Sequence, residues 1–314
     1  MSEHLIVRTE GGTSPALILA LCLAAAPGGL MRAQATPVAT NSLARFPCNP
    51  EEIAHYTAYR TGEAVHIDGR LDEKGWQRAP RSPRFIDILT GKPTLYDTRA
   101  AVLWDDRNLY VGFWVEEPKV KATLTKHGSH IYENNDVEVF IAGRDTYYEF
   151  EINALNTVYE AFFIWEDSYD KGGYAEAPEF KRSNPLVVPF NGVGFTNHPR
   201  GLRLGSWAFE FLGLKTAVHI DGTLNDDSDT DRGWTVELAF PWQGMKWLAN
   251  ERPLPPREGD VWRMFFGRFE KLTPSGIEVQ PHPAWCWNKH GIMDTHRPDR
   301  FTCVHFSERL VEDL

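Results

Sequence analysis

The sequence lacks a long apolar run beyond its first 35 residues, and it lacks an excess of positive charge. It has 43 acidic residues against 33 lysines and arginines, giving a formal net charge of -10. This balance argues against nucleic acid and anionic lipid as partners, and no segment of the mature chain is apolar enough for a membrane span. Hydrophobic residues still make up 42% of the chain, which is enough for a sizeable core.

The signatures of common enzyme and metal-binding families are also missing. There is no G-x-S-x-G elbow, no phosphate-binding P-loop, no H-E-x-x-H helix and no clustered Cys/His spacing for zinc. No organic cofactor is therefore expected, and no motif indicates that the protein is an enzyme by itself.

The N-terminus has the pattern of an export signal. Residues 16–26 form an apolar run that is too short to span a bilayer. Ala33-Gln34-Ala35 then supplies the small-x-small pattern that signal peptidase accepts. Residues 1–35 are therefore predicted to be a signal peptide cleaved near Ala35, and the mature protein is expected to be secreted or periplasmic.

Only four cysteines are present, and three of them follow the predicted cleavage point. Cys286 and Cys303 flank a turn-rich segment and could face each other across two strands. An oxidising compartment permits a disulfide between them. Three buried thiols, Cys48 included, are the alternative, and the sequence leaves both open.

Strand and turn patterns dominate the rest of the chain. Residues 36–62 form a lead-in without clear periodicity, and residues 63–314 are expected to form one domain. Residues 98–104 and 109–115 flank a polar turn and predict a hairpin. Further strands follow at regular intervals. One short helix is expected after Pro241, and long loops are expected over residues 166–206. The expected fold is all-β, a two-sheet, jelly-roll-like β-sandwich.

Two neighbouring strands carry the most informative pattern. In residues 136–141 and 147–153, side chains that suit a core alternate with a second set, which must face the opposite side of the sheet. If the strands pair, one polar face holds Glu138, Glu149, Glu151 and Asn153. Carboxylates and amides accept hydrogen bonds from sugar hydroxyls, and neighbouring aromatic rings stack on sugar C–H faces.

At five places, in order, the sequence resembles family 9 carbohydrate-binding modules. The matching segments are IDGRLDE at 67–73 with Trp76 and Ala79-Pro80, VLWDD at 102–106 with LYV at 109–111, NDVEVFI at 135–141, GWTVELAFPW at 233–242, and HRP at 296–298 with Phe301. The similarity runs from about residue 64 to residue 306. It implies a β-sandwich that binds sugars, often beside structural calcium and often as an appendage of a plant-polysaccharide hydrolase.

The resemblance also implies aromatic contacts to a sugar. Binding members of the family clamp a sugar ring between two aromatic side chains. The first position corresponds to Tyr132, and the second corresponds to His296, where this chain lacks the usual tryptophan. Trp285 and Trp287 are nearby in the sequence and could substitute for it.

The polar contacts of the family carry over in part. The acid on the central strand corresponds to Glu138, and a basic residue with an asparagine two positions later corresponds to Glu151 and Asn153. The basic residue has therefore become an acid. Arg268 is a further candidate, either beside a bound sugar or, like Arg99, in a salt-bridge network on a solvated sheet face.

A second acidic pattern lies at Asp227, Asp229 and Asp231. Alternating carboxylates followed by Gly233 resemble calcium-binding loops, because hard cations need several oxygen ligands. The glycine falls one position late for an EF-hand, and a solvated acidic turn is the alternative.

Carbohydrate binding is the favoured function, within exported polysaccharide-degrading machinery that includes a separately encoded glycoside hydrolase. The main alternative is a glycoside hydrolase, because Glu138 and Glu151 on neighbouring strands could approach the separation of about 5–5.5 Å found in retaining enzymes. A haem-binding electron-transfer domain is the third reading, with Met245, Met264 and Met293 as available thioether ligands.

Overall fold

The computed structural model describes residues 50–193 and 197–314. The predicted signal peptide, Cys48 and most of the predicted lead-in lie outside the described residues. Two short α-helices are present in them, α1 (Lys74–Arg78) and α2 (Lys246–Ala249), and α2 follows the 3-10 turn η7 (Trp242–Met245) at the place where the sequence predicts a helix. None of the helices in this part of the chain has the length and apolarity needed to cross a membrane.

Strands form most of the regular structure, and the sheet extends through nearly the whole described chain. The strands are β1 (His55–Arg60), β2 (Ile86–Asp87), β3 (Thr98–Trp104), β4 (Asn108–Glu116), β5 (Asp136–Ala142), β6 (Thr146–Asn153), β7 (Val158–Trp165), β8 (Val187–Phe190), β9 (Arg203–Ser206), β10 (Lys215–Asp221), β11 (Gly233–Pro241), β12 (Val261–Phe269), β13 (Ala284–Cys286) and β14 (Thr302–Leu310).

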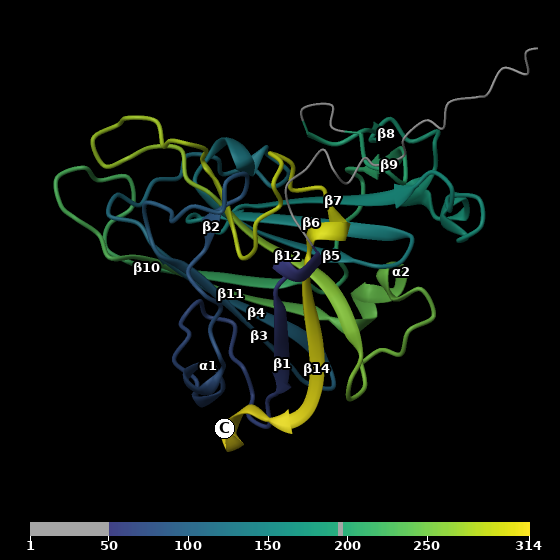
Figure 1. The fold of residues 1–314 in the computed structure, drawn as a ribbon, viewed down its shortest axis with the longest axis horizontal. Helices are drawn as coiled ribbons and strands as arrows, with labels where there is room; N and C mark the ends of the chain where they lie inside the picture. Colours follow the sequence, from purple (N-terminus) through teal and green to yellow (C-terminus); the bar gives the residue numbers. More distant parts are fainter. Residues whose placement is uncertain (1–49, 194–196) are drawn as a thin grey trace, which may run out of the picture. The chain divides into compact units, whose positions relative to one another are not determined.

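These strands join edge to edge in the order β10-β11-β4-β3-β1-β14-β12-β5-β6-β7-β9-β8, with β13 pairing with β12 and β2. The two pairings of β1, with β14 and with β3, are parallel. β1 and β14 therefore connect two halves, which Figure 1 shows as two layers, one around β3, β4 and β11 and one around β5, β6 and β7. The predicted all-β sandwich fold is confirmed.

The main core lies between the two layers and follows the period-two alternation of the strands. Val139 of β5 and Phe150 of β6 point inward, and they share one buried cluster with Phe113 of β4 and Leu238 of β11. The side chains at the alternate positions of each strand point to the opposite face of the sheet. The side-chain orientations predicted for 136–141 and 147–153 are therefore confirmed.

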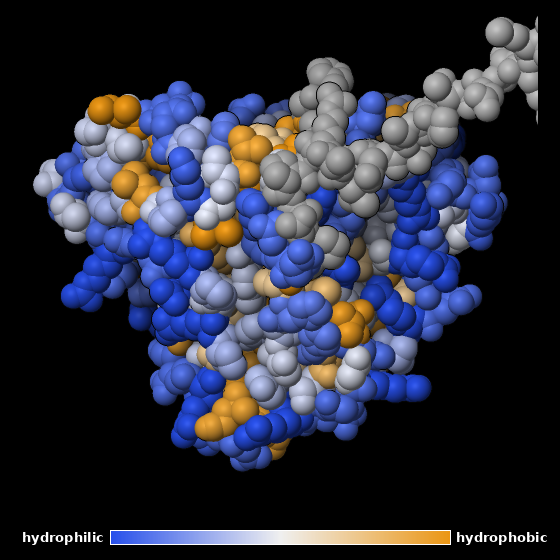
Figure 2. Space-filling model, viewed as in Figure 1, coloured by the Kyte–Doolittle hydropathy of each residue, from blue (hydrophilic) through white to orange (hydrophobic). Residues whose placement is uncertain are grey.

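The outer faces of both layers are covered as well. Outside β3, β4 and β11, Leu103 and Tyr110 pack with Trp76 of α1 in a small buried cluster. Outside β5, β6 and β7, Phe140 and Phe163 belong to another buried cluster. The surface visible in Figure 2 is mostly hydrophilic, with scattered apolar side chains.

Several short strands differ from the sequence expectation. β1 lies inside the predicted lead-in, and its partners β3 and β14 are distant in the sequence. β8 and β9 lie in a segment expected to form only loops, and they extend the sheet beyond β7.

The two cysteines of the C-terminal part do not face each other. Cys286 is opposite Gly267 and Cys303 is opposite Arg263, at two separate places along the edge of β12 that faces away from β5. Both are buried, and Cys303 is a free thiol. Gly267 and Arg263 are four positions apart, which is about 13 Å along a strand and too far for the Cα–Cα distance of about 4.4–6.8 Å in a disulfide. Of the two alternatives, the disulfide is therefore ruled out.

Candidate functional site

A cavity of about 310 Å³ lies over the outer face of β5, β6 and β7. Its floor is acidic and its walls are largely aromatic. The residues that define its character are Glu138, Glu149 and Glu151 on the floor, Tyr132, Tyr159, Phe163, Phe190, Trp207 and Phe269 on the walls, and His296 with its neighbours Asp294 and Thr295.

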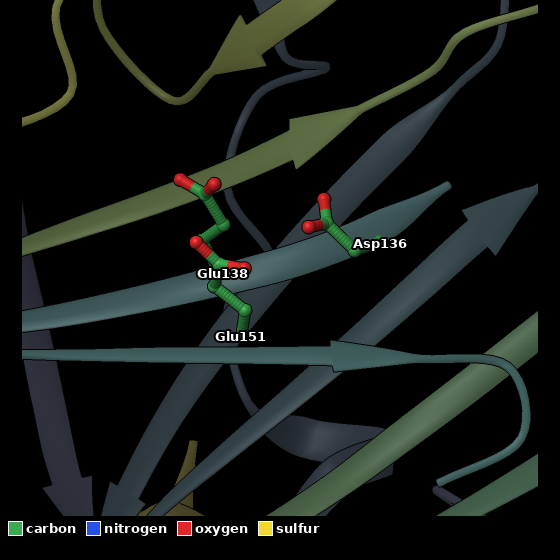
Figure 3. A group of neighbouring side chains, drawn as sticks. All are labelled: Asp136, Glu138 and Glu151. Atoms are coloured by element: carbon green, nitrogen blue, oxygen red, sulfur yellow. The ribbon is translucent and has the colours of Figure 1, made fainter. Parts of the chain in front are cut away.

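The floor is built by the antiparallel pairing of β5 and β6. Glu138 lies directly opposite Glu151, and Asp136 lies opposite Asn153. Because side chains two positions apart share a face, Glu149 joins Glu151 there. These four acids, hereafter the carboxyl quartet (Asp136, Glu138, Glu149 and Glu151), are each at most 4% exposed. Figure 3 shows the side chains of three of them close together.

Few donors satisfy the carboxyl quartet. The backbone N–H of Tyr132 donates to Glu151 Oε2 at 2.9 Å, and that of Phe269 donates to Asp136 Oδ1 at 3.0 Å. One oxygen each of Asp136, Glu138 and Glu149 has no hydrogen-bond partner. Within residues 50–193 and 197–314, no lysine or arginine forms an ion pair with the quartet. The acids are therefore both buried and poorly compensated.

Burial makes ionisation of these acids unfavourable, and their mutual repulsion adds to the effect. Burial raises the pKa of Asp136 to about 7 and that of Glu149 to about 8. The pKa values of Glu138 and Glu151 are raised well above the usual range, by burial first and then by the neighbouring acids. The site therefore retains protons at neutral pH unless a positive group enters it.

Aromatic side chains form the rim of the cavity. Tyr132 is 36% exposed, and its ring stands perpendicular to that of Tyr159 at a centroid distance of 6.2 Å. The half-buried Trp207 donates a hydrogen bond from Nε1 to the Tyr159 hydroxyl and packs edge-on against Phe163 at 5.8 Å. Exposed and half-buried rings above polar groups are the combination that sugar binding requires.

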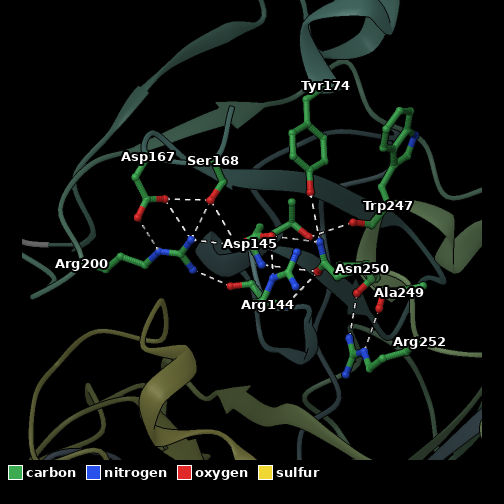
Figure 4. Close-up of polar contacts among 12 residues, drawn as sticks. Arg144, Asp145, Asp167, Ser168, Tyr174, Arg200, Trp247, Ala249, Asn250 and Arg252 are labelled. Carbon is green, nitrogen blue, oxygen red and sulfur yellow. Dashed lines mark hydrogen bonds and ion pairs between the residues drawn. The ribbon is translucent and has the colours of Figure 1, made fainter. Parts of the chain in front are cut away.

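Ion pairs hold the wall segment that carries Phe190 and Trp207. Arg200 forms ion pairs with Asp145, in the turn between β5 and β6, and with Asp167, both at 2.9 Å. The Asn250 side-chain oxygen accepts a hydrogen bond from the backbone N–H of Arg144 at 2.8 Å in the same turn. Figure 4 shows this network. It fixes the segment after β7 to the hairpin that supplies the floor.

His296 lies in the cavity wall, but it is a buried polar connection and not an exposed stacking ring. Its Nε2 lies 3.4 Å from Glu149 Oε1, and its Nδ1 lies 3.2 Å from the Tyr147 hydroxyl. Burial, and secondarily the nearby guanidinium of Arg203, hold the pKa of His296 well below its usual range. The imidazole is therefore neutral and contributes no positive charge to the floor.

The structure brings together four of the residues predicted from the sequence, namely Tyr132, Glu138, Glu151 and His296. Asn153 is not among the residues that line the cavity. Its side-chain oxygen accepts hydrogen bonds from the backbone N–H groups of Leu155 and Thr157, and its amide donates to Leu124 O at 2.9 Å. The residue stabilises the turn after β6 because those backbone groups would otherwise lack partners.

Trp285, Trp287 and Arg268 also lie away from the cavity. Both tryptophans belong to the main core, and Trp287 packs edge-on against Tyr56 at 5.0 Å. The Arg268 guanidinium lies 5.0 Å above the Trp285 ring and pairs with Glu270 at 2.5 Å. Arg268 of β12 and Trp285 of β13 point to the inner face, and none of the three residues lines this cavity.

The acidic loop does not gather its carboxylates around one point. The two oxygens of Asp231 accept hydrogen bonds from the backbone N–H groups of Thr223 and Val120. Asp227 pairs with Lys121 at 2.8 Å, and Asp229 accepts from the Thr223 hydroxyl. In the part of the chain that the structure describes, only Asp136, Glu138 and Glu151 form a group with metal-ligand geometry.

Sequence reasoning missed part of the cavity. Glu149 was placed on the correct face by its alternation but was not selected as a site residue. Tyr159 and Phe163 of β7 follow the same alternation, which could have identified them. Phe190 is the last residue of β8 and Trp207 directly follows β9, in a segment where the sequence shows no periodicity. Nothing in the local pattern indicated that they would face the floor.

Comparison with known protein families agrees with the resemblance seen in the sequence. Residues 67–179 match the family model described as carbohydrate family 9 binding domain-like. This match confirms the predicted likeness to family 9 carbohydrate-binding modules, and it includes the β5–β6 hairpin of the cavity floor. No curated protein matches the sequence.

Three solved structures resemble this chain to different degrees. A candidate carbohydrate-binding protein from Bacteroides uniformis has a TM-score of 0.52 at 15% identity, over 81% of this chain and 99% of its own. A family 9 carbohydrate-binding module from Caldicellulosiruptor kristjanssonii, solved with cellotriose and with glucose, has a TM-score of 0.43 at 16% identity, over 81% of this chain and 94% or 96% of its own. At this identity, the Bacteroides structure shows a shared fold.

Proposed function

We propose that this chain, with its likeness to family 9 carbohydrate-binding modules, binds a carbohydrate in the cavity above β5, β6 and β7. The observation that carries the proposal is the arrangement of acidic groups below aromatic rings in that cavity. Glu138, Glu149 and Glu151 form an acidic floor, and Tyr132 and Trp207 stand at an aromatic rim. Sugar hydroxyls find acceptors below, and sugar C–H faces find rings beside them.

The size of the cavity suits a small ligand. Its volume of about 310 Å³ lies at the lower end of the range of about 300–1,000 Å³ for small-molecule pockets. A mono- or disaccharide, or the end of a longer chain, fits that range better than an internal stretch of polysaccharide. The buried floor also favours an end, because the ligand must enter from the rim.

Isothermal titration against a panel of mono-, di- and oligosaccharides tests the proposal. We expect binding of at least one sugar, and a roughly tenfold weaker affinity in Tyr132→Ala, corresponding to about 1.4 kcal/mol. Trp114→Ala is the matched control, because Trp114 is a partly exposed ring outside this cavity. No binding to any sugar, or equal weakening by both substitutions, would contradict the proposal.

We also propose that the chain acts outside the cytoplasm, beside a separately encoded glycoside hydrolase. The support is the export pattern of residues 1–35, including Ala33-Gln34-Ala35. Expression of the full chain in a bacterium, followed by mass spectrometry of the exported fraction, tests this location. The expected product begins at Thr36, and an uncleaved chain retained in the cytoplasm would refute it.

A glycoside hydrolase is the second candidate, because Glu138 and Glu151 face each other with ligand oxygens within 4.8 Å. Burial raises the pKa of both, whereas a retaining enzyme needs one of its two acids ionised. Sugar release that disappears in Glu138→Gln would favour this candidate. The haem reading is weaker, since Met245 and Met264 are buried in the main core.

A further inference from the structure

The carboxyl quartet contains a three-oxygen group that joins two acids of the cavity floor to Asp136, which the sugar-binding proposal does not use. Asp136, Glu138 and Glu151 each offer an oxygen, and these three oxygens lie within 4.8 Å of one another. Calcium–oxygen distances are about 2.3–2.6 Å, so two oxygens that share one ion lie at most about 5 Å apart. The three carboxyl groups therefore already have the spacing of a cation site.

Buried oxygens without partners provide a second, independent observation. Glu138 is 1% exposed, and its Oε2 has no hydrogen-bond partner; the same holds for Asp136 Oδ2 and for Glu149 Oε2 beside them. A buried polar atom without a partner costs free energy, and a buried charge costs more. An ion bound between these side chains would remove that cost.

Among residues 50–193 and 197–314, no lysine or arginine pairs with these acids. Arg268 is committed to Glu270 and Glu117 on the inner face, at 2.5 and 3.5 Å. The Lys271 ammonium lies over the Phe269 ring at 4.5 Å. His296 faces Glu149, but both of its ring nitrogens are engaged and it is next to Arg203. A cation bound from solution would supply the charge that these described side chains do not.

The carboxyl groups are also held in place. The backbone N–H of Tyr132 fixes one oxygen of Glu151, and that of Phe269 fixes one oxygen of Asp136. Two neighbouring β-strands fix the distances between the side chains. This preorganisation resembles that of metal sites, in which outer hydrogen bonds orient the ligands. The ligand set contains only oxygen, which favours hard cations over zinc or copper.

We propose that Asp136, Glu138 and Glu151 bind a divalent, oxygen-preferring cation such as Ca²⁺ at the floor of the cavity. The site goes beyond the sugar-binding proposal, since the ion would be held by side chains of the protein alone. Glu149 lies on the same face of the sheet, two positions from Glu151 on β6. Coordination positions that face the cavity are open to water or to the hydroxyl groups of a ligand.

Calcium titration of metal-free protein, with no sugar present, tests the site. The full chain is treated with EDTA, dialysed, and titrated with CaCl₂ by calorimetry and by thermal denaturation. We expect saturable binding and a higher Tm, because a ligand that binds only the folded state stabilises it. Glu138→Gln and Asp136→Asn should each weaken calcium binding at least tenfold while retaining the near-UV circular dichroism of the folded protein.

Asp229→Asn is the matched control, since it removes one carboxylate from the exposed acidic loop. It should leave calcium affinity unchanged. A protein that shows no calcium binding, or one that loses binding in Asp229→Asn but not in Glu138→Gln, would overturn the proposal. Binding of glucosamine but not of Ca²⁺ by the metal-free protein would overturn it too, since the floor would then compensate an amine.

The two proposals fail separately. Sugar binding without any calcium response would overturn the cation site and leave the sugar-binding proposal standing. A calcium response that depends on Glu138, in a protein that binds no sugar of the panel, would support the cation site and count against the sugar. Parallel sugar titrations with EDTA and with CaCl₂ distinguish these results.

Discussion

Buried acids occur on the outer faces of both layers, but their surroundings differ. Glu237 of β11 is fully buried; its Oε1 accepts a hydrogen bond from Trp76 Nε1 at 2.9 Å, and its Oε2 accepts from the backbone N–H groups of Asp68 and Gly69. Glu138 of β5 is equally buried, yet one of its oxygens has no partner. Burial of an acid therefore does not by itself identify a site.

The segments that cover the two faces explain the difference. The loop before α1 brings two N–H donors onto Glu237 and α1 itself brings the third, Trp76 Nε1. Gly69 allows the close approach of the loop, since a Cβ there would lie 2.5 Å from the backbone of Val218. Over the carboxyl quartet, the covering segments bring mostly aromatic rings and leave a cavity. One acid is a structural anchor, and the other group is available to a ligand.

Replacement of the structural anchor should have the largest effect. Glu237→Ala removes the acceptor of three buried N–H groups, and each unsatisfied donor costs about 1–3 kcal/mol. We expect the free energy of unfolding to fall by about 3–5 kcal/mol, measured by urea denaturation. Glu63→Ala, at an exposed position, serves as control. A loss below about 1 kcal/mol would mean that the two faces do not differ as described.

Glu270 is an intermediate case, because it shares the Arg268 guanidinium with Glu117. Burial raises the pKa of Glu270 to about 8, whereas the unfolded value is about 4.3. The folded state thus binds more protons between these values, so this group's contribution to stability is lost as pH rises. Relative to Glu270→Gln, the wild type should lose about 2.5 kcal/mol between pH 5 and pH 7.

Urea denaturation of both proteins at the two pH values measures that difference. A Glu270→Gln protein whose stability changes with pH in parallel with the wild type would contradict the assignment. It would also mean that one guanidinium is sufficient for two buried acids.

Asn153 lies on the same sheet face as the carboxyl quartet, and its replacement tests whether its role is structural or in binding. Because its side chain accepts two hydrogen bonds from the turn after β6 and donates one to Leu124 O, Asn153→Ala should lower the free energy of unfolding by about 1–3 kcal/mol. Sugar affinity of the folded variant should stay within about twofold of the wild type, or about 0.4 kcal/mol. A large loss of sugar affinity without a change in stability would show that Asn153 contacts the sugar.

Glu138→Gln should have the smallest effect on stability. The substitution keeps the shape of the side chain and removes no donor from a hydrogen bond, so metal-free protein should change by less than about 1 kcal/mol. Thermal denaturation of metal-free wild type and variant at pH 6 gives this value. A loss comparable to that of Glu237→Ala would show that Glu138 is a structural anchor as well.

The acidic floor was accessible from the sequence because it rests on local alternation. Period two in 136–141 and 147–153 places Glu138, Glu149 and Glu151 on one face, whatever the rest of the fold. The same rule placed Asn153 there, but the turn at the end of β6 uses its side chain. Alternation in the sequence predicts which face of the sheet a side chain lies on, but it does not predict the hydrogen-bond partners of that side chain.

The walls and the core partners were not accessible in this way. Trp207 and Phe190 approach the floor only because β8 and β9 add to the edge of β7. Trp285 and Arg268 turn inward through the pairing of β12 with β13. These positions depend on contacts between segments distant in the sequence, and no periodicity in a single sequence records them.

The parallel strand β1 has a practical consequence for where the domain begins. It pairs with β14 on one edge and with β3 on the other, so it closes the seam between the layers. A truncated chain that starts at Glu63 would leave two strand edges with unpaired N–H and C=O groups, which are templates for self-association. Its aggregation on expression would locate the true start of the folding unit before His55.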